Sequence, residues 1–336
     1  MSSKQLDKST VAEQSTVAEQ STVAEQSTAR STPRPPPPDA YGLKKLSSPG
    51  TAKPIVDIIL VGDISKTRDE PWGLGAGFFF WPVKIPEVEI YEFLYPGNQV
   101  IPSITPIEAV TDLEKHISKE TMANVSRSLR LAATNPNQFT QKRRAPYVIL
   151  IGYGYGGLIC ERVIALALES SPATRVIKGL ILFGTPHFSH GLTQWAKIVV
   201  KTTSEDPKIT TGNGGGSSNV INAIRNLRQL VLSKDLPDLS ELGRYFGHIS
   251  AVQRMFFDKT RRGRWGTNIV SCFPEASPSN PEQLTILPEW STIPHGFPVR
   301  VPKPYLEMTN FQENEDDAFG IISDLIKGWV AKLKAP

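Results

Sequence analysis

The stretch Val148–Ile159 reads VILIGYGYGGLI, and it decides which fold the chain can adopt. Its first half is a short apolar run that ends in glycine, a pattern typical of a strand buried on both faces. The segment GLICERVIALALES, Gly157–Ser170, then has the residue spacing of a helix. A buried strand that passes through a glycine turn into a helix is the repeating unit of parallel sheets covered by helices.

The same unit recurs on both sides of this stretch. We expect strands at Ile55–Gly62, Glu87–Tyr95, Tyr147–Gly152, Val176–Gly184 and Thr267–Phe273, and further helices at Ile107–Leu131 and Ala318–Leu333. Short buried strands that alternate with helices predict an α/β fold with a mostly parallel central sheet and helices on both faces. We assign this domain to residues 53–336.

The segment before the domain has a different composition. The hexapeptide STVAEQ occurs three times in Ser9–Gln26, and four prolines follow at Pro35–Pro38. A period of six is too short for a helical repeat, and so polar a segment buries too little apolar surface to offset the entropy of ordering. We therefore predict that residues 1–52 form a disordered tail with a short polyproline spacer.

Composition narrows the classes of function. The 336 residues include 37 basic and 33 acidic ones, and a net charge of +4 does not favour nucleic acid as a partner. No apolar run reaches the ~18 residues of a membrane span, and the N-terminus has no signal-peptide core. The two cysteines, Cys160 and Cys272, fit neither a zinc spacing nor a disulfide framework. We expect a cytoplasmic protein without a transmembrane segment, a metal or a cofactor.

The glycine turn also has the context of a catalytic motif. A strand that runs into Gly-x-x-x-Gly and then a helix forms a nucleophile elbow when serine occupies the central position. Here the turn reads Gly152-Tyr153-Gly154-Tyr155-Gly156-Gly157, so Gly154 stands where the serine would be.

The sequence around the turn extends its similarity to a nucleophile elbow. Together with VIKGLILFGTPHFSHGLTQW, Val176–Trp195, the turn resembles the lipase- and esterase-like α/β-hydrolases of the serine-active-site-containing protein group, which occur at the N-termini of fungal NACHT and NB-ARC receptors. Members of this family have Ile-Gly-His-Ser-Leu-Gly-Gly at the turn and then a strand ending Phe-Gly-Thr-Pro-His, here Phe183–His187. The resemblance covers about Ile55–Leu333. It implies an α/β-hydrolase fold and, where the site is intact, hydrolysis of carboxylic esters or lipids.

Two functional positions of this family are altered here. The resemblance places the nucleophile at Gly154, which has no side chain and cannot attack a substrate. It places the turn that builds the oxyanion hole at Val61-Gly62-Asp63-Ile64. An acid at Asp63 would oppose the developing negative charge of an acyl-transfer reaction if its side chain pointed inward.

The general base of the family is altered as well, whereas the position of the acid stays open between two residues. The resemblance places the general base in PKPYLEMTNF, at Tyr305 or Leu306. A phenol with a pKa near ~10 is a poor base at neutral pH. The acid that orients the base should lie near TILPEWS, where Pro288 and Glu289 are the candidates. His187 belongs to the Thr-Pro-His turn, to which the resemblance assigns a structural role.

Three hypotheses follow. The first is a catalytically inactive hydrolase-fold protein with a binding, sensing or interaction role toward a protein or a small apolar ligand. The second is an active ester or lipid hydrolase whose serine and histidine have moved elsewhere. The third is nucleotide binding at Gly152–Gly157, which also matches Gly-x-Gly-x-x-Gly but lacks the acidic residue expected after the next strand. In the first case the former pocket is lined by Gly62, Asp63, Tyr153, Gly154, Tyr155 and His187.

Overall fold

The computed structural model describes eleven parts of the chain: residues 42–47, 54–63, 85–95, 126–134, 147–167, 172–205, 247–261, 268–275, 286, 288–311 and 317–334. All of them belong to one compact unit that spans Pro38–Pro336. The STVAEQ repeats and the polyproline segment lie outside the described residues.

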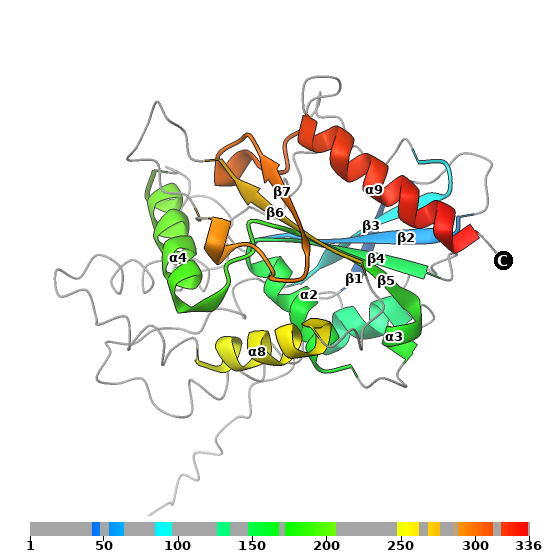
Figure 1. The fold of residues 1–336 in the computed structure, drawn as a ribbon, viewed down its shortest axis with the longest axis horizontal. Helices are drawn as coiled ribbons and strands as arrows, with labels where there is room; N and C mark the ends of the chain where they lie inside the picture. Colours follow the sequence, from blue (N-terminus) through cyan, green and yellow to red (C-terminus); the bar gives the residue numbers. More distant parts are fainter. Residues whose placement is uncertain are drawn as a thin grey trace, which may run out of the picture. The chain divides into compact units, whose positions relative to one another are not determined.

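A single mixed sheet forms the centre of this unit (Figure 1). The strand order is β1-β3-β2-β4-β5-β6-β7, and β1 runs antiparallel to β3 whereas all other neighbours are parallel. The strands are β1 Gly42–Ser47, β2 Val56–Val61, β3 Val88–Leu94, β4 Tyr147–Tyr153, β5 Ile177–Phe183, β6 Asn268–Pro274 and β7 Phe297–Val301.

Helices cover both faces of the sheet, as expected for buried parallel strands. In Figure 1, α9 lies over one face, and α2, α3 and α8 lie over the other. The helices are α2 Tyr155–Ala165, α3 Pro172–Val176, α4 Phe188–Glu205, α8 Gly247–Arg261 and α9 Asp317–Lys334, with short 3-10 turns η6 Pro288–Trp290 and η7 Tyr305–Glu307. Residues 126–134 are also helical. In the described part of the chain, none of these helices has both the length and the apolar character needed to cross a membrane.

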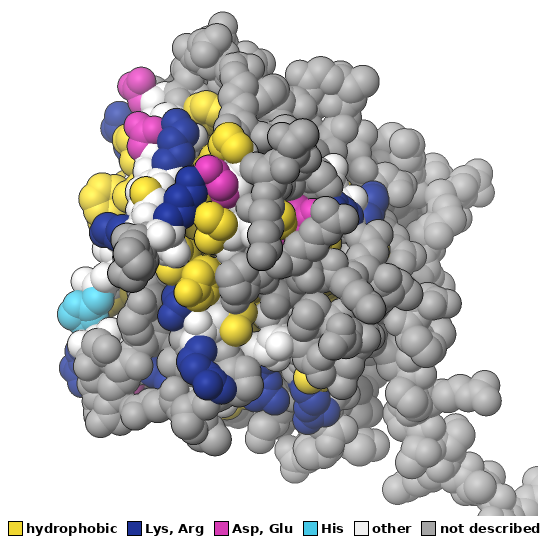
Figure 2. All heavy atoms as spheres, turned by 90° about the vertical axis from the view of Figure 1, so that its right-hand side faces the viewer, with side chains coloured by type: hydrophobic (Ala, Val, Ile, Leu, Met, Phe, Trp, Pro, Cys, Tyr) yellow, Lys and Arg dark blue, Asp and Glu magenta, His cyan; other side chains and the backbone are white. Residues whose placement is uncertain are grey.

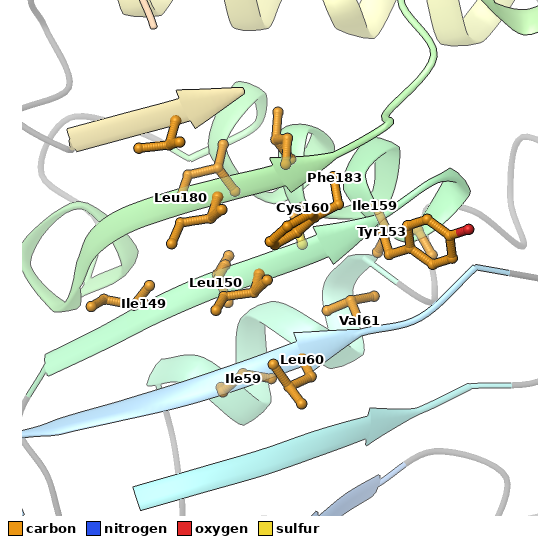
Figure 3. Close-up of a cluster of buried hydrophobic side chains, with 14 of the residues drawn as sticks. Ile59, Leu60, Val61, Ile149, Leu150, Tyr153, Ile159, Cys160, Leu180 and Phe183 are labelled. Carbon is orange, nitrogen blue, oxygen red and sulfur yellow. The ribbon is translucent and has the colours of Figure 1, made fainter. Parts of the chain in front are cut away.

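The core consists of the apolar runs that predicted the strands. Side chains of β2, β4 and β5 are almost completely buried, and α2 adds Ile159 and Cys160 (Figure 3). Because both faces of these strands are covered, each apolar run is nearly continuous rather than alternating. All five predicted strands are confirmed, with ends that differ by no more than one residue.

Three predicted boundaries were wrong. Gly42–Ser47 lies inside the predicted tail, yet it forms β1 and pairs with β3. The first pair of this ladder joins Gly42 to Leu94. The lysines of β1 hid the strand, because charged side chains are typical of a sheet edge and dilute the apolar pattern. Helix α2 begins at Tyr155 rather than Gly157, so two glycines lie in its first turn. The helix predicted at Ile107–Leu131 is described only from residue 126, and it continues to 134.

The other sheet edge, β7, was not predicted. Its sequence FPVRV buries only Val299 and Val301, while Phe297, Pro298 and Arg300 are exposed. Proline is typical of edge strands because it cannot donate a hydrogen bond to a further strand. The apolar pattern of the sequence therefore predicts the edge strands β1 and β7 less well than the buried central strands.

This arrangement is an α/β-hydrolase fold, with one antiparallel strand beside a parallel sheet and a tight turn between β4 and α2. In such sheets the functional residues follow the carboxyl ends of the strands. Asp63 follows β2, Gly154 follows β4, Gly184 follows β5, and Tyr305 follows β7. Topology thus brings residues from across the chain to one edge of the sheet.

The surface charge is mixed in sign. On α9, Lys327 pairs with Asp324 at 3.0 Å, and Lys334 pairs with Glu87 of the turn before β3. Figure 2 shows basic and acidic side chains close together on the described part of one face. On this described part of the surface, charges of opposite sign lie close together, which agrees with the small net charge.

Replacing Gly328 in α9 by alanine is expected to stabilise the protein by about 0.5–1 kcal/mol, since alanine loses less backbone entropy in a helix. A Cβ atom at Gly328 would meet nothing within 4 Å. Gly179 in β5 is the matched control, because a Cβ there would lie 2.5 Å from Trp329 Cζ3 and should destabilise the fold. Urea denaturation of both variants measures the difference. Equal effects of the two substitutions would contradict the packing of α9 on β5.

Candidate functional site

The turn at Gly154 keeps a backbone conformation that side chains rarely adopt. Its φ is 53° and its ψ is −122°, and it lies between the end of β4 and the first residue of α2. Its N–H donates to the carbonyl oxygen of Phe183 over 2.9 Å, and its own carbonyl accepts from the Gly157 N–H over 3.1 Å. A positive φ of this kind strains any residue except glycine, so the surrounding hydrogen bonds and packing hold the turn in place.

Two side chains fill the space in front of Gly154. A Cβ atom built on this residue would lie 2.5 Å from Asp63 Cγ and 2.6 Å from Asp63 Oδ2, and closer still to the phenolic oxygen of Tyr305. Such distances are below any real contact distance of a Cβ atom. The position from which a nucleophile would project is therefore occupied by a carboxylate and a phenol.

The Asp63 carboxylate accepts three hydrogen bonds from three separate elements. The backbone N–H of Tyr155 donates to Oδ1 over 3.1 Å, the Tyr305 hydroxyl donates to Oδ2 over 2.9 Å, and the Trp195 indole N–H donates to Oδ2 over 3.3 Å. Asp63 is only 5% exposed, and a buried charge requires such donors. The positive end of α2 stabilises the same carboxylate, because Tyr155 is the first residue of that helix.

The backbone N–H of Tyr155 occupies the position of an oxyanion-hole donor in this fold. In α/β-hydrolases the N–H of the residue after the nucleophile is one of the donors of the oxyanion hole. Tyr155 directly follows Gly154, and its N–H is bonded to Asp63 Oδ1. The Asp63 carboxylate therefore lies where a hydrolase of this fold would stabilise a transient negative charge.

Tyr305 is packed into this group by stacking and by close contact with a second glycine. Its ring stacks on Tyr153 with centroids 5.2 Å apart, and the Tyr153 hydroxyl donates to the Tyr305 carbonyl oxygen over 2.8 Å. Gly184, whose φ is 52°, lies against the ring, since a Cβ there would be 2.7 Å from Tyr305 Cε2. Tyr155 in turn packs on Trp195 with centroids 5.4 Å apart.

Burial determines the protonation of these phenols. Desolvation raises the pKa of Tyr153, Tyr155 and Tyr305 above the ordinary value of tyrosine, and the negative charge of Asp63 raises it further. Tyr95 behaves in the same way, and its hydroxyl donates to the Gly62 carbonyl oxygen over 2.6 Å. All four hydroxyls therefore remain protonated at neutral pH, and those of Tyr95, Tyr153 and Tyr305 act as hydrogen-bond donors rather than as bases.

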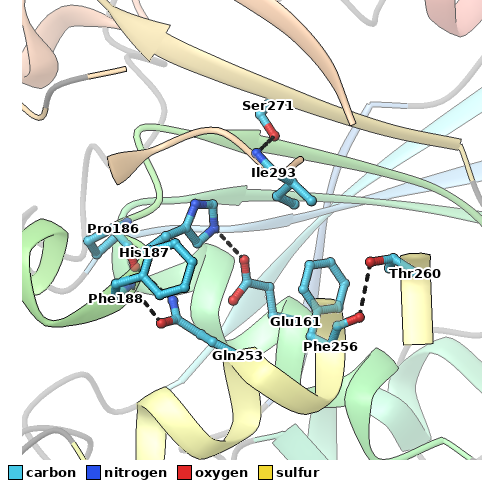
Figure 4. Close-up of polar contacts among 9 residues, drawn as sticks. All are labelled: Glu161, Pro186, His187, Phe188, Gln253, Phe256, Thr260, Ser271 and Ile293. Carbon is cyan, nitrogen blue, oxygen red and sulfur yellow. Dashed lines mark hydrogen bonds and ion pairs between the residues drawn. The ribbon is translucent and has the colours of Figure 1, made fainter. Parts of the chain in front are cut away.

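His187 belongs to a different buried group (Figure 4). Its Nε2 lies 2.6 Å from Glu161 Oε1 of α2, and both side chains are completely buried. Gln253 of α8 holds the flanking backbone: it accepts from the Phe188 N–H and donates to the Pro186 carbonyl, each over 2.9 Å. The structure thus uses His187 to tie the loop after β5 to two helices, separately from the bonds that join Asp63 and Tyr305.

The two acid candidates do not join the site. Pro288 and Glu289 lie in η6 and are exposed, whereas the Tyr305 hydroxyl bonds to Asp63. The acid that follows the carboxyl end of β6 is Glu275, which sequence reasoning missed. Glu275 forms an ion pair with Arg300 of β7 at 3.2 Å, with both side chains partly exposed.

Sequence reasoning also missed Trp195, Glu161 and Gln253. Glu161 leaves one detectable signal, because a single acid within the apolar helical pattern of α2 indicates a buried partner. Trp195 belongs to the Val176–Trp195 sequence that carries the resemblance, but neither it nor Gln253 has a local signal of its partner, since these partners are distant in the sequence. No cluster of three or more His, Cys, Asp or Glu side chains suited to a metal occurs among the residues that the structure describes.

Comparisons with known proteins find structural likeness alone. No family model matches the chain, and no curated protein matches its sequence. Among solved structures, a lipase-esterase related protein from Clostridium acetobutylicum ATCC 824 is 11% identical, with 86% of this chain and 99% of that chain covered at a TM-score of 0.40. The Vlm2 thioesterase domain is 12% identical, with 87% and 98% covered at 0.36. A proline iminopeptidase from Mycobacterium smegmatis is 8% identical, with 86% and 95% covered at 0.36. The fold assignment rests on the strand order and connections of this chain.

Proposed function

We propose that this chain is a catalytically inactive α/β-hydrolase-fold protein that acts by binding, sensing or interaction. One observation carries the proposal: the space in front of Gly154 is filled by Asp63 and Tyr305, which are hydrogen-bonded to each other over 2.9 Å. Relation to receptor N-terminal domains and location in the cytoplasm stay predictions from the sequence.

Three requirements of acyl transfer, a nucleophile, a base and a free oxyanion donor, are unmet among the described residues at this edge of the sheet. Gly154 offers no nucleophile, and the Tyr305 phenol is a buried donor whose pKa is raised rather than lowered toward neutrality. The Asp63 carboxylate accepts the hydrogen bond that a tetrahedral intermediate would need from Tyr155. A second negative charge at that position would be repelled, so the arrangement opposes the transition state.

The alternative hypothesis, an active site at another serine and histidine, has little support in the described part of the structure. His187 with Glu161 is the pair that most resembles a base with its orienting acid, at 2.6 Å. Both side chains are 0% exposed, so an ester substrate could not reach the imidazole. The pair is better explained as an internal support for the loop after β5.

Nucleotide binding at Gly152–Gly157 is also disfavoured. A dinucleotide would place its pyrophosphate at the N-terminus of the helix that follows the glycines. The Tyr155 N–H at that terminus already donates to Asp63. A phosphate there would be repelled by the carboxylate, as two like charges at short distance are.

The nature of the partner follows from packing. The predicted pocket residues Tyr153, Tyr155, His187 and Asp63 are all buried, and the first two stack on other aromatic rings. Among the described residues, these side chains pack on one another rather than around an open space, which argues against a small apolar ligand among them. We therefore favour a protein partner that contacts the surface.

Labelling of the full chain with a fluorophosphonate probe tests this proposal. The full chain is required because removal of residues 1–52 would delete β1. We expect no covalent adduct on the folded protein, while an active hydrolase of the same fold, labelled in parallel, reacts fully. A stoichiometric adduct on one serine, located by peptide mass spectrometry, would overturn the proposal and identify a relocated nucleophile.

A further inference from the structure

We infer that the start of α4 and the adjoining side of α8 form a docking surface for an acidic segment of a partner protein that also carries an aromatic or large aliphatic side chain. This Phe188 surface consists of Phe188, Arg254, Phe257 and Arg261. The inference rests on the proposed function, in which a protein partner contacts the surface, and deepens it by naming the surface and the chemistry of the partner.

Phe188 has a backbone conformation that aromatic residues rarely adopt. Its φ is 57°, and among the residues that the structure describes it alone has a positive φ without being glycine. A bulky residue in this region is strained, and such strain persists only where the surrounding structure enforces it. Glycine would fit position 188 without strain, so the presence of a phenyl ring there calls for a role of the ring itself.

Buried polar side chains hold the backbone around Phe188 in place (Figure 4). Gln253 uses both ends of its amide: Oε1 accepts from the Phe188 N–H, and Nε2 donates to the Pro186 carbonyl, each over 2.9 Å. Between these two residues, His187 is bonded to Glu161 of α2 over 2.6 Å. The side chains of Gln253, His187 and Glu161 are completely buried. Buried polar groups are costly unless they are paired, so this network fixes the segment that presents Phe188.

The phenyl ring that this segment presents is partly exposed and rests on a second ring. Phe188 is 37% exposed, and its ring packs on Phe257 of α8 with centroids 5.3 Å apart. Phe257 is half-buried and meets the His187 imidazole edge to face at 5.4 Å. Aromatic side chains that are fixed before binding lose little entropy in an interface, and aromatic residues are frequent among those that dominate binding energy.

Two arginines border these rings. At 3.6 residues per turn, Arg254 and Arg261 lie within about 60° of Phe257 around the axis of α8. Within the described ranges, Arg254 is exposed and pairs with no acid. Arg261 lies 3.3 Å from Asp258, and these two side chains are 64% and 44% exposed. An ion pair so open to water is weak, so both arginines are available to carboxylates of a partner.

The charges decide which partner fits the Phe188 surface. Cations beside aromatic rings are complemented by carboxylates beside an apolar side chain, which a protein segment can supply. Anionic membranes are recognised by clusters of about four to eight basic residues. The described part of α8 instead presents two exposed arginines with Asp258 between them in the sequence. An acidic protein segment is therefore favoured over a membrane.

The test selects peptides from a random dodecapeptide phage library on the immobilised full chain. We expect selected peptides to contain an aromatic or large aliphatic residue beside at least two acidic ones. Fluorescence anisotropy with a synthetic copy should show binding weakened on the order of 30-fold by Phe188→Ala, the usual loss at an aromatic residue that dominates an interface. The charge reversal Arg254→Glu/Arg261→Glu should also abolish tight binding, and added salt should weaken binding to the unaltered chain.

Met255→Ala is the matched control. Met255 is 49% exposed on α8, but it lies about 160° from Phe257 around the helix axis. Its replacement should leave peptide binding unchanged. The charge reversal keeps the test decisive if Phe188→Ala does not fold, because exposed arginines contribute little to stability.

Selection without any acidic apolar peptide overturns the inference. A peptide that binds Phe188→Ala and the charge-reversal variant as tightly as the unaltered chain overturns it as well. Binding to phosphatidylserine vesicles without peptide binding, lost in the same variants, overturns it in favour of a membrane. The proposed function has its own test, since a fluorophosphonate adduct on the unaltered chain contradicts it whatever the peptides show.

Two further variants test whether position 188 is strained. Phe188→Gly and Phe188→Ala both lack the ring, but glycine tolerates a φ of 57° and alanine does not. We expect Phe188→Gly to melt roughly 2–4 °C above Phe188→Ala, with tight peptide binding lost in both. A glycine variant that melts at or below the alanine variant would show an unstrained backbone and would overturn the inference.

Discussion

Raising the pH above about 10 is expected to unfold this protein in the same transition in which its buried tyrosines ionise. Tyr95, Tyr153, Tyr155 and Tyr305 all have pKa values raised by burial, with the charge of Asp63 as a further cause. Their folded-state pKa values lie above those of the unfolded chain. The stability that they contribute is therefore complete below the unfolded pKa and is lost as the pH rises above it.

The size of this effect follows from the number of linked protons. Each proton released only on unfolding costs about 1.4 kcal/mol of stability per pH unit, so the four tyrosines together cost about 5 kcal/mol per unit. The buried thiols of Cys160 and Cys272, whose pKa values burial also raises, add to this slope. A domain with a total stability of about 5–15 kcal/mol would be unfolded within one to three pH units. Urea denaturation along a pH series measures the slope.

Tyrosinate absorbance and far-ultraviolet circular dichroism should change together in this titration. Tyr305→Phe is the control variant, because it removes one of the four phenols but keeps the ring that stacks on Tyr153. It should lower the slope of stability against pH by about one proton. Tyrosinate absorbance that rises fully while the dichroism stays native would show that the phenols are accessible to solvent.

Separating His187 from Glu161 is expected to cost about 1–3 kcal/mol, the usual penalty when a buried polar group is left without its hydrogen-bond partner. The two groups are 2.6 Å apart and completely buried, so neither can turn to water when its partner is lost. Glu161→Leu leaves an imidazole without its acceptor, and His187→Leu leaves a buried carboxylate without its donor. Both substitutions should strongly lower the midpoint of urea denaturation.

The double variant Glu161→Leu/His187→Leu should cost less than the sum of the two single variants. Removing both partners leaves no unpaired polar group, and an apolar pair can replace a buried polar pair at little cost. Glu289→Gln is the control, since its side chain is exposed in η6 and should change stability by no more than about 0.5 kcal/mol. Additive effects of the two single substitutions would show that the contact between His187 and Glu161 contributes no energy of its own.

The buried strands could be predicted because their pattern is local. Strands β2, β4 and β5 are covered on both faces, and this requires continuous apolar runs that stand out in any window of the sequence. The edge strands β1 and β7 could not be predicted in the same way. Each has a neighbour on only one side, and their lysine, arginine and proline residues are permitted by exposure.

The candidate site likewise has features that residue type alone predicts and features that depend on contacts between distant parts of the chain. That Gly154 cannot be a nucleophile is a property of glycine, and that Asp63 brings a negative charge to the turn after β2 is a property of its residue type. The direction of the Asp63 side chain, in contrast, depends on the tertiary structure. Its donors Trp195 and Tyr305 lie 132 and 242 positions away in the chain, and no local pattern links them.

By itself, the sequence determined the class of fold, the tight turn at Gly154 and the absence of a side-chain nucleophile at that residue, because apolar periodicity and glycine chemistry act over a few neighbouring residues. Only the tertiary structure decided that Asp63 turns inward onto Tyr155, that Tyr305 fills the space above Gly154, and that His187 pairs with Glu161. These contacts exist because parallel strands bring their carboxyl ends to one edge of the sheet, whatever their separation along the chain.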